Sequence, residues 1–336
     1  MKRVALYINS SSLNDATSHY IDIINKAASN LGYISYITDS INDISFNDII
    51  LTIVPNNFLK ALLMRPFCKT LFWSQGIEPE ESWLRENNLF KYYAKNIIEY
   101  TALRFSGMQF LVSESMLNHY KDKYGINFSN YQIMPCYNLP HEEEININLA
   151  KYKNPTFVYA GSLSAWQNIH ETLQVYKYIE NIIPEATLTL LTEENKKAKN
   201  LIEQYAIQNA QVRYVSLGDL NEELLKYKYG FLLRKDIKVN NVSTPTKMNS
   251  YLSSGVIPIY TDAIKDFLKH IDLNNFNIRL KSNNSIEEMA NTILSFENNE
   301  NDFSEFNIKI KKIFKSYFND DKYIDQIKIK LRSYLS

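Results

Sequence analysis

The chain has 336 residues, of which 45% are hydrophobic and 22% charged, so it is long enough for two globular domains and too apolar to be disordered. Its 37 basic and 37 acidic side chains cancel, which argues against a general nucleic-acid binder, because such proteins carry a basic excess. The two cysteines, Cys68 and Cys136, lie in no metal-binding motif, so a disulfide scaffold is excluded, a zinc site has little support and a reducing cytoplasm is expected.

Further classes are excluded by the absence of their patterns. The eight glycines form neither a GxGxxG nor a GxxxxGK[ST] loop. The apolar run at residues 4–8 is too short for a signal peptide, and no stretch reaches the roughly 20 apolar residues of a membrane span. We therefore expect a protein without a membrane span, which could still rest on a membrane surface.

Strand and helix patterns alternate through the first half of the chain. Short apolar runs predict strands, and apolar residues at helical spacing predict the helices between them. The predicted strands are 4–8, 34–38, 48–54, 71–73, 109–113 and 131–134, and the predicted helices are 17–31, 58–64, 91–104 and 115–124, the last ending at the C-cap Gly125.

The polar residues 141–154 interrupt the alternation, which then starts again. We interpret them as a linker between a domain at 1–140 and a second at 155–310. In the second domain the predicted strands are 156–159, 187–191, 212–215, 229–233 and 256–260, and the predicted helices are 169–180, 197–206, 221–226 and 247–253. Alternation in both halves predicts two doubly wound α/β domains with mostly parallel sheets, whose ligands bind beyond the carboxyl ends of the strands.

The tail at 311–336 mixes apolar and aromatic residues with many lysines, which predicts an amphipathic helix. Its lysine face could simply be solvated, or it could meet anionic lipid headgroups.

Residues 157–169, FVYAGSLSAWQNI, predict a strand that runs through Gly161-Ser162 into a helix. Glycine at a strand end permits a ligand to approach the backbone, and the free N–H groups of the next helix suit a phosphate. An ordinary strand-to-helix turn has the same pattern.

A second segment places cations where a phosphate could bind. The strand FLLRKD at 231–236 delivers Arg234 and Lys235 at its carboxyl end, and arginine grips phosphate oxygens with several donors. Thr244 is the expected N-cap of the next helix, with Pro245 in its first turn. Lys247 is unfavourable for the dipole at this position, so it calls for an anionic partner, although it could equally be solvated.

These motifs resemble the GT-B-fold glycosyltransferases of bacterial O-antigen and capsule synthesis, allied to the family-four retaining transferases. The segment VSTPTKMNSYLSSGVIP at 242–258 is similar to their carboxyl-terminal domain, as is the YAGS turn. In the first half, FWSQGIEPEES at 72–82 and LVSESMLNHY at 111–120 are similar to their amino-terminal domain. The resemblance spans both halves and implies two Rossmann-like domains facing across a cleft, with the terminal helix crossing back to the first.

The resemblance implies that the second domain binds a nucleotide diphosphate sugar. The implied donor-binding residues are Gly161, Ser162, Trp166, Arg234, Lys235, Thr244, Lys247, Asn249 and Ser250. This chain has Trp166-Gln167 where the family often has a basic residue, so Arg234 and Lys247 would neutralise the diphosphate. Ser250 replaces the glutamate that binds the donor ribose in the family, and a hydroxyl offers no charged bidentate acceptor.

The resemblance places the acceptor on the first domain. The implied acceptor-side residues are Ser11, Gln75, Gly76, Glu78 and Glu114. A retaining enzyme of this kind needs no protein nucleophile, because the leaving diphosphate takes the acceptor's proton while Arg234 and Lys247 stabilise its charge. An inverting enzyme needs a base, for which Glu78 is the first candidate and Glu80, Glu81 and Glu114 are alternatives. Gln75 stands where the family often has histidine, and it can bind a sugar hydroxyl but cannot shuttle protons.

The predicted function is sugar transfer from a nucleotide diphosphate sugar to a glycan or lipid-linked acceptor, without metal or cofactor. A lipid-linked acceptor would bring the protein to the inner face of the cytoplasmic membrane, through the basic and aromatic residues 89–104. The same residues equally suit an amphipathic helix that faces the core. Ser250 and Gln75 motivate one alternative, a weakly catalytic binding subunit that supports a partner transferase. A GT-B-like epimerase is another, and it would release free sugar without an acceptor.

Overall fold

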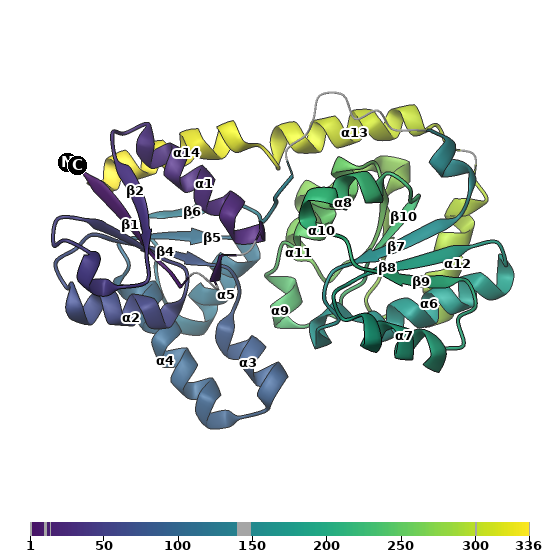
Figure 1. The fold of residues 1–336 in the computed structure, drawn as a ribbon, viewed down its shortest axis with the longest axis horizontal. Helices are drawn as coiled ribbons and strands as arrows, with labels where there is room; N and C mark the ends of the chain where they lie inside the picture. The colour runs from purple at the N-terminus through teal and green to yellow at the C-terminus, as the bar shows by residue number, and fades with distance from the viewer. Residues whose placement is uncertain (1, 10–11, 14, 140–148, 300, 336) are drawn as a thin grey trace. The chain divides into compact units, whose positions relative to one another are not determined.

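The computed structural model describes residues 2–9, 12–13, 15–139, 149–299 and 301–335. They form two compact units, each with its own sheet (Figure 1). Unit 1 comprises Met1–Asn138, Val242–Thr244 and Asn319–Ser336, and unit 2 comprises Leu139–Asn241 and Pro245–Phe318.

Unit 1 contains a sheet of six strands in the order β2-β1-β3-β4-β5-β6, with every neighbouring pair parallel. The strands are β1 (Arg3–Tyr7), β2 (Ile34–Thr38), β3 (Ile49–Thr52), β4 (Thr70–Ser74), β5 (Met108–Leu111) and β6 (Tyr131–Ile133). The helices are α1 (Asp15–Ser29), α2 (Pro55–Met64), α3 (Glu78–Glu86), α4 (Leu89–Phe105), α5 (Glu114–Tyr124) and α14 (Asp320–Leu335).

The local sequence explains where the unit 1 elements begin and end. The inner strands are apolar on both faces because helices cover both sides of a parallel sheet. Pro55 starts α2, where a missing N–H costs nothing. The Ser113 hydroxyl caps α5, and Gly125 ends it in the left-handed region, as predicted.

Unit 2 contains a second parallel sheet of six strands, in the order β12-β11-β10-β7-β8-β9. The strands are β7 (Thr156–Ala160), β8 (Thr187–Leu191), β9 (Ala210–Arg213), β10 (Tyr229–Leu232), β11 (Ile257–Thr261) and β12 (Ile278–Leu280). The helices are α6 (Ile169–Ile182), α7 (Asn195–Gln204), α8 (Leu217–Leu224), α9 (Lys238–Asn241), α10 (Thr246–Ser253), α11 (Lys265–His270), α12 (Ile286–Glu297) and α13 (Phe303–Ser316).

The two parallel sheets confirm the predicted fold class, while several elements escaped prediction. The helix α3 begins with the loop-like sequence EPEE at residues 78–81, and β12 has only three residues, so neither was selected from the sequence. The predicted tail helix at 311–336 is wrong: two helices, α13 and α14, meet near Asn319. The Asn319 side chain accepts a hydrogen bond from the Lys322 N–H at 2.8 Å, which starts a new helix there.

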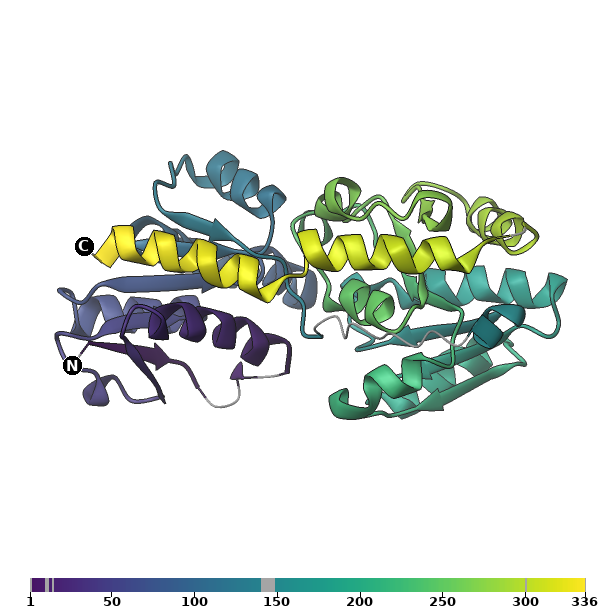
Figure 2. The same ribbon diagram turned by 90° about the horizontal axis from the view of Figure 1, so that it is seen from above.

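The terminal helix α14 completes unit 1, where it lies beside α1 (Figure 2). Its buried face is formed by Tyr323, Ile327 and Leu331. The Gln326 carboxamide accepts a hydrogen bond from Gln132 of β6 at 2.9 Å. Residues far apart in sequence therefore share one core. Among the described residues, no helix combines the length and apolar character that crossing a membrane requires.

Candidate functional site

The turn after β7 in unit 2 lies against a lysine. Gly161 has a φ of +130°, which a side chain would strain, and a Cβ built there would lie 2.7 Å from Lys247 Cε. In the structure the group that closely approaches this turn is Lys247 of α10, and the approach of a ligand stays a prediction.

Arg234 follows β10 and is 4% exposed. Its N–H donates to Thr261 Oγ1 at 3.0 Å, and its guanidinium Nη1 donates to the Trp166 carbonyl oxygen at 2.9 Å. Within the described part of the chain, its buried Nε has no hydrogen-bond partner. Because buried donors are normally satisfied, this free N–H indicates a site for an acceptor that the protein itself does not supply.

Lys247 is partly buried in the first turn of α10. Its Nζ donates to Gln167 Oε1 at 2.8 Å and lies 3.9 Å from the centroid of the Tyr159 ring. Burial and the nearby Arg234 hold the pKa of Lys247 well below its usual value, and burial lowers the pKa of Arg234 to about 10.

Among the described residues, neither cation forms an ion pair with a carboxylate. An anion bound between them would relieve both the burial cost and their mutual repulsion. Gln167, noted in the sequence only as a departure from the family, holds Lys247 in place.

Two peptide N–H groups of this turn are already bonded within the protein. The Gly161 N–H donates to the Leu191 oxygen at 2.8 Å, and the Leu163 N–H donates to Glu194 Oε1. A 3-10 turn at Ala165–Gln167 separates these residues from α6, so the helix does not begin at the turn.

Other predicted donor residues lie apart from the two cations. Thr244 belongs to unit 1 and does not cap α10, because its Oγ1 accepts the Cys136 N–H at 2.9 Å. The Asn249 amide donates to and accepts from the Leu139 backbone, both at 2.9 Å. The Ser250 hydroxyl donates to the Thr246 oxygen of its own helix. These polar groups, which the sequence analysis assigned to donor binding, therefore form hydrogen bonds within the protein.

Ser162 and Lys235 are exposed next to this site. The Ser162 hydroxyl shares a hydrogen bond with the Ser164 hydroxyl at 3.0 Å. Both residues border the site but add no contact to the buried pair.

Unit 1 contains a cavity of about 450 Å³ beyond the carboxyl ends of its strands. Gln75, Gly76 and Glu78 line it, so the structure brings together three predicted acceptor-side residues. The full lining is Ser12, Ile53, Val54, Pro55, Phe72, Ser74, Gln75, Gly76, Glu78, Glu81 and Glu99.

The remaining acceptor-side predictions have different outcomes. Glu114 begins α5 and is exposed, and it does not line the cavity. Glu80 also lies outside the lining, paired with Lys123 Nζ at 2.9 Å. Ser11 lies outside the described residues. Glu78 Oε1 accepts a hydrogen bond from Lys95 Nζ at 2.9 Å.

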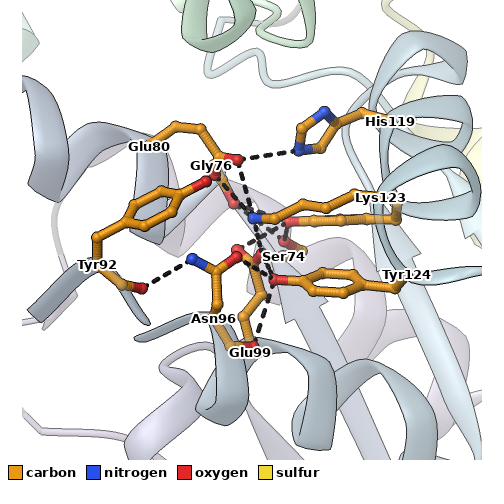
Figure 3. Close-up of polar contacts among 10 residues, drawn as sticks. Ser74, Gly76, Glu80, Tyr92, Asn96, Glu99, His119, Lys123 and Tyr124 are labelled. Carbon is orange, nitrogen blue, oxygen red and sulfur yellow. Dashed lines mark hydrogen bonds and ion pairs between the residues drawn. The ribbon is translucent and has the colours of Figure 1, made fainter. Parts of the chain in front are cut away.

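The buried Glu99 of α4 also lines the cavity, although the sequence analysis did not select it (Figure 3). Tyr124 donates to Glu99 Oε2 at 2.7 Å, and Lys123 Nζ lies 3.2 Å from the same oxygen. Burial raises the pKa of Glu99 to about 7, against the opposing effects of Lys123 and Tyr124. The sequence offered one signal for this role: Glu99 is the single acidic residue of α4, a helix rich in apolar and aromatic residues.

The hydroxyl of Tyr120 links the loop after β4 to this network. It lies 2.6 Å from Ser74 Oγ and donates to the Gly76 oxygen at 3.0 Å. Burial raises the pKa of Glu81, and a Cβ at Gly76 would overlap the Glu81 carboxylate. The glycine thus lets Glu81 reach the cavity. In the described part of the chain, no three His, Cys, Asp or Glu side chains gather as a metal-binding set.

Comparisons with known proteins were made by sequence and by structure. No family model matches the sequence, and no curated protein matches it either. Solved structures do match. The sucrose-phosphate synthase of Thermosynechococcus elongatus has a TM-score of 0.74 at 10% identity, with 100% of this chain and 99% of that chain covered.

Two further matches were solved as complexes that contain UDP or a UDP-sugar. Anabaena HepE in complex with UDP-glucose has a TM-score of 0.72 at 11% identity, covering 99% of this chain and 100% of that one. A variant of S. aureus TarM, in complex with fondaparinux, α-GlcNAc-glycerol and UDP, has a TM-score of 0.65 at 13% identity. The match covers 86% of this chain and 55% of the TarM chain, so this chain spans about half the length of TarM. At these identities the likeness is one of fold, and the chain has the two-domain α/β fold of GT-B glycosyltransferases.

Proposed function

We propose that this chain is a glycosyltransferase that moves a sugar from a nucleotide diphosphate sugar to a glycan or lipid-linked acceptor in bacterial surface polysaccharide synthesis. The observation that carries the proposal is the pair Arg234 and Lys247 beside the Gly161 turn, two cations for which the described residues supply no carboxylate partner. A diphosphate supplies the missing negative charge. The fold likeness to structures solved with UDP and UDP-glucose supports this choice of anion.

The proposed reaction is retaining and independent of metal and cofactor, with the nucleotide sugar as co-substrate. As the bond between the sugar and the diphosphate breaks, negative charge grows on the leaving oxygen, and Arg234 and Lys247 stabilise it. The departing diphosphate takes the proton of the acceptor hydroxyl while the new glycosidic bond forms. Gln75 and Glu78 position the acceptor through hydrogen bonds to its hydroxyls.

The test is nucleotide binding by Arg234→Ala and Lys247→Ala, measured calorimetrically with UDP. Loss of a charge-assisted hydrogen bond costs about 1–3 kcal/mol, so each variant should bind UDP roughly 5- to 150-fold more weakly. Lys281→Ala, an exposed lysine of unit 2, is the matched control and should keep the wild-type affinity. Unchanged affinity in both site variants would remove the basis of the proposal.

A second candidate function is a sugar- or nucleotide-binding subunit that supports a partner transferase. The observation in its favour is Ser250, whose hydroxyl is bonded within α10 and leaves the donor ribose without the family's acidic partner. Purified protein incubated with UDP-, GDP- and dTDP-sugars separates the two. Thermal stabilisation together with sugar transfer or donor hydrolysis indicates an enzyme, and stabilisation without turnover in the presence of acceptor indicates the subunit.

Peripheral contact with an anionic membrane is also part of the proposal. Unit 1 exposes a stripe of large apolar side chains along α4, with Phe90 83% and Ile97 67% exposed. Exposed Lys91 and Arg104 lie on the same helix. The other exposed members of the stripe are Leu89, Tyr93, Tyr100 and Phe105, and Leu63 of the adjoining α2 is also exposed. Aromatic and basic residues together suit a lipid interface.

Vesicle co-sedimentation tests this contact. Wild-type protein should sediment with phosphatidylglycerol vesicles more than with phosphatidylcholine vesicles, and less at high salt. Phe90→Ser combined with Ile97→Ser should reduce sedimentation severalfold. Ile329→Ser, an equally exposed change on α14, serves as the control. Equal binding by the stripe variant and the control would exclude this face of α4.

A further inference from the structure

The two candidate pockets present different polar groups. Among the described residues, the two cations of the unit 2 site have no carboxylate partner. The unit 1 cavity is lined by three carboxyl groups, Glu78, Glu81 and Glu99, and its lining, drawn from the described residues, contains no lysine, arginine or histidine. The two pockets therefore offer a ligand different groups, cationic donors in unit 2 and carboxyl groups in unit 1.

The cations that accompany the three acids lie outside the lining. Lys95 Nζ is 2.9 Å from Glu78, Lys123 Nζ is 3.2 Å from Glu99, and Arg85 Nη1 is 3.8 Å from Glu81. They balance charge from the sides of α3, α4 and α5, while the cavity itself presents oxygen atoms. A phosphate or carboxylate in this space would face carboxyl groups, and the described lining offers it no cationic donor.

The other polar groups of the lining suit neutral hydroxyls. The Ser12 hydroxyl and the exposed Gln75 carboxamide can both donate and accept hydrogen bonds. Carboxylates accept hydrogen bonds from hydroxyl groups, and Glu81 reaches the cavity across the bare Cα of Gly76. The volume of about 450 Å³ is ample for a monosaccharide unit.

We infer that the unit 1 cavity takes an uncharged sugar through its hydroxyl groups and rejects phosphorylated and carboxylated sugars, with Glu81 and Glu99 as the residues that determine this specificity. The inference rests on the proposed function, because it names the class of acceptor for the same enzyme. It distinguishes this chain from a synthase whose acceptor is a sugar phosphate.

The test compares matched sugars on the intact protein in the presence of saturating UDP, which occupies the cationic site. Glucose, galactose, mannose and N-acetylglucosamine are each paired with their 6-phosphates, and glucose also with glucuronic acid. Binding is measured by saturation-transfer NMR, so the comparison does not require turnover. At least one neutral sugar should bind, and its anionic counterpart should bind about tenfold more weakly or not at all, as expected for a ligand placed against like charge.

Two glutamine variants locate the effect. Glu81→Gln keeps the shape of the side chain and removes its charge, so the preference for the neutral sugar should shrink severalfold. Glu86→Gln, on the same helix but paired with Lys91 outside the cavity, should keep the wild-type preference. Tighter binding of the anionic sugars, no binding of any neutral sugar, or an unaltered preference in Glu81→Gln would each overturn the inference.

The same samples keep the two proposals apart. Stabilisation of the protein by UDP and its loss in Lys247→Ala report on the donor site alone. A protein that binds UDP but prefers sugar phosphates would sink the acceptor inference and leave the proposed function standing. A protein that binds neutral sugars through Glu81 but ignores UDP would sink the proposed function instead.

Discussion

At the scale of single residues, the candidate donor site depends on groups that the fold buries without compensating charge. Arg234 keeps an unpaired Nε, and Lys247 rests on Tyr159 and Gln167 rather than on an acid. Burial of these groups lowers the stability of the protein when no ligand is bound. Proteins retain such groups at sites where binding of a ligand restores the lost stability. Gly161 is the residue that makes room for the lysine.

Gly161→Ala should weaken UDP binding about tenfold or more, with some loss of stability. The new Cβ would lie 2.7 Å from Lys247 Cε and force the ammonium away, in a backbone region that a side chain strains. Calorimetry with UDP gives the affinity. Gly125→Ala, also at a positive φ but with no atom within 4 Å of the new Cβ, should cost stability and leave UDP affinity intact. Equal affinities for all three proteins would contradict the role of Gly161.

Lys151 is another buried basic residue, away from the candidate donor site. Its burial should make the free energy of unfolding depend on pH. It is buried, its Nζ donates to the Ser254 oxygen at 2.6 Å, and burial lowers its pKa to about 7. Between pH 7 and about 10.4, the ordinary lysine pKa, the unfolded chain keeps a proton that the folded chain releases, so stability should rise with pH. The rise is at most about 1.4 kcal/mol per pH unit.

Urea unfolding of wild type and Lys151→Met at pH 7, 8 and 9 measures this rise. The variant should lose much of the slope, because methionine fills a similar space without titrating. Lys153→Met, an exposed change in the same 3-10 turn, should keep it. Parallel slopes for wild type and Lys151→Met would show that the buried amine does not titrate in this range.

At the scale of elements, the position of Lys247 is set by how α10 packs on the sheet of unit 2. Tyr251, one turn further along α10, donates its hydroxyl proton to the Phe231 oxygen and accepts the Ala160 N–H. It thereby joins α10 to both β7 and β10. Gly230 of β10 admits the Tyr251 ring, because a Cβ there would lie 2.7 Å from its carbon atoms.

Gly230→Ala should therefore destabilise the protein by about 1–3 kcal/mol, the usual cost of overpacking a core. Because the ring and helix must shift together, UDP affinity should fall as well. Gly218→Ala in α8, with its nearest contact at 3.8 Å, should be neutral or slightly stabilising. Thermal unfolding with and without UDP measures both effects, and a Gly230→Ala protein as stable as Gly218→Ala would refute the packing argument.

At the scale of the whole molecule, the chain order and the units do not coincide. The last 18 residues, Asn319–Ser336, belong to unit 1, where α14 buries Tyr323, Ile327 and Leu331 against elements from the start of the chain. Unit 1 therefore depends on residues far away in sequence from its other elements, whereas Arg234 and Lys247 both belong to unit 2.

Removal of residues 319–336 should unfold unit 1 and leave UDP binding to unit 2 largely intact. Each large apolar side chain buried by α14 contributes about 1.5–3 kcal/mol, and together they approach the stability of a small domain. Limited proteolysis should cut the truncated protein within unit 1, while calorimetry still detects UDP binding. Joint loss of both properties would contradict independent units.

A pair of substitutions provides a milder test of the same dependence. Ile327→Ala, at a fully buried position, should cost about 2–5 kcal/mol, and Ile329→Ala, at a position 67% exposed, should cost little. Similar effects of the two substitutions would mean that α14 does not pack as described.

The sequence by itself determined the alternation of strands and helices, and from it the two parallel sheets, because apolar periodicity is a local property. It also directed attention to Gly161 and Arg234 at strand ends and to Lys247 at a helix start, while Gln75, Gly76 and Glu78, which line the cavity, were selected through the family resemblance. The tertiary structure decided the rest. Thr244, Asn249 and Ser250 found partners inside the protein, and the amides of the Gly161 turn were taken by Leu191 and Glu194.

The acids of the cavity show the same division. The sequence analysis did not select Glu99, which lies in a helix of apolar and aromatic residues. Its role depends on contacts with Tyr120, Lys123 and Tyr124 of another helix. Periodicity records which face of an element is buried. It does not record which polar groups meet once the elements pack, and that meeting fixes the charge of each pocket.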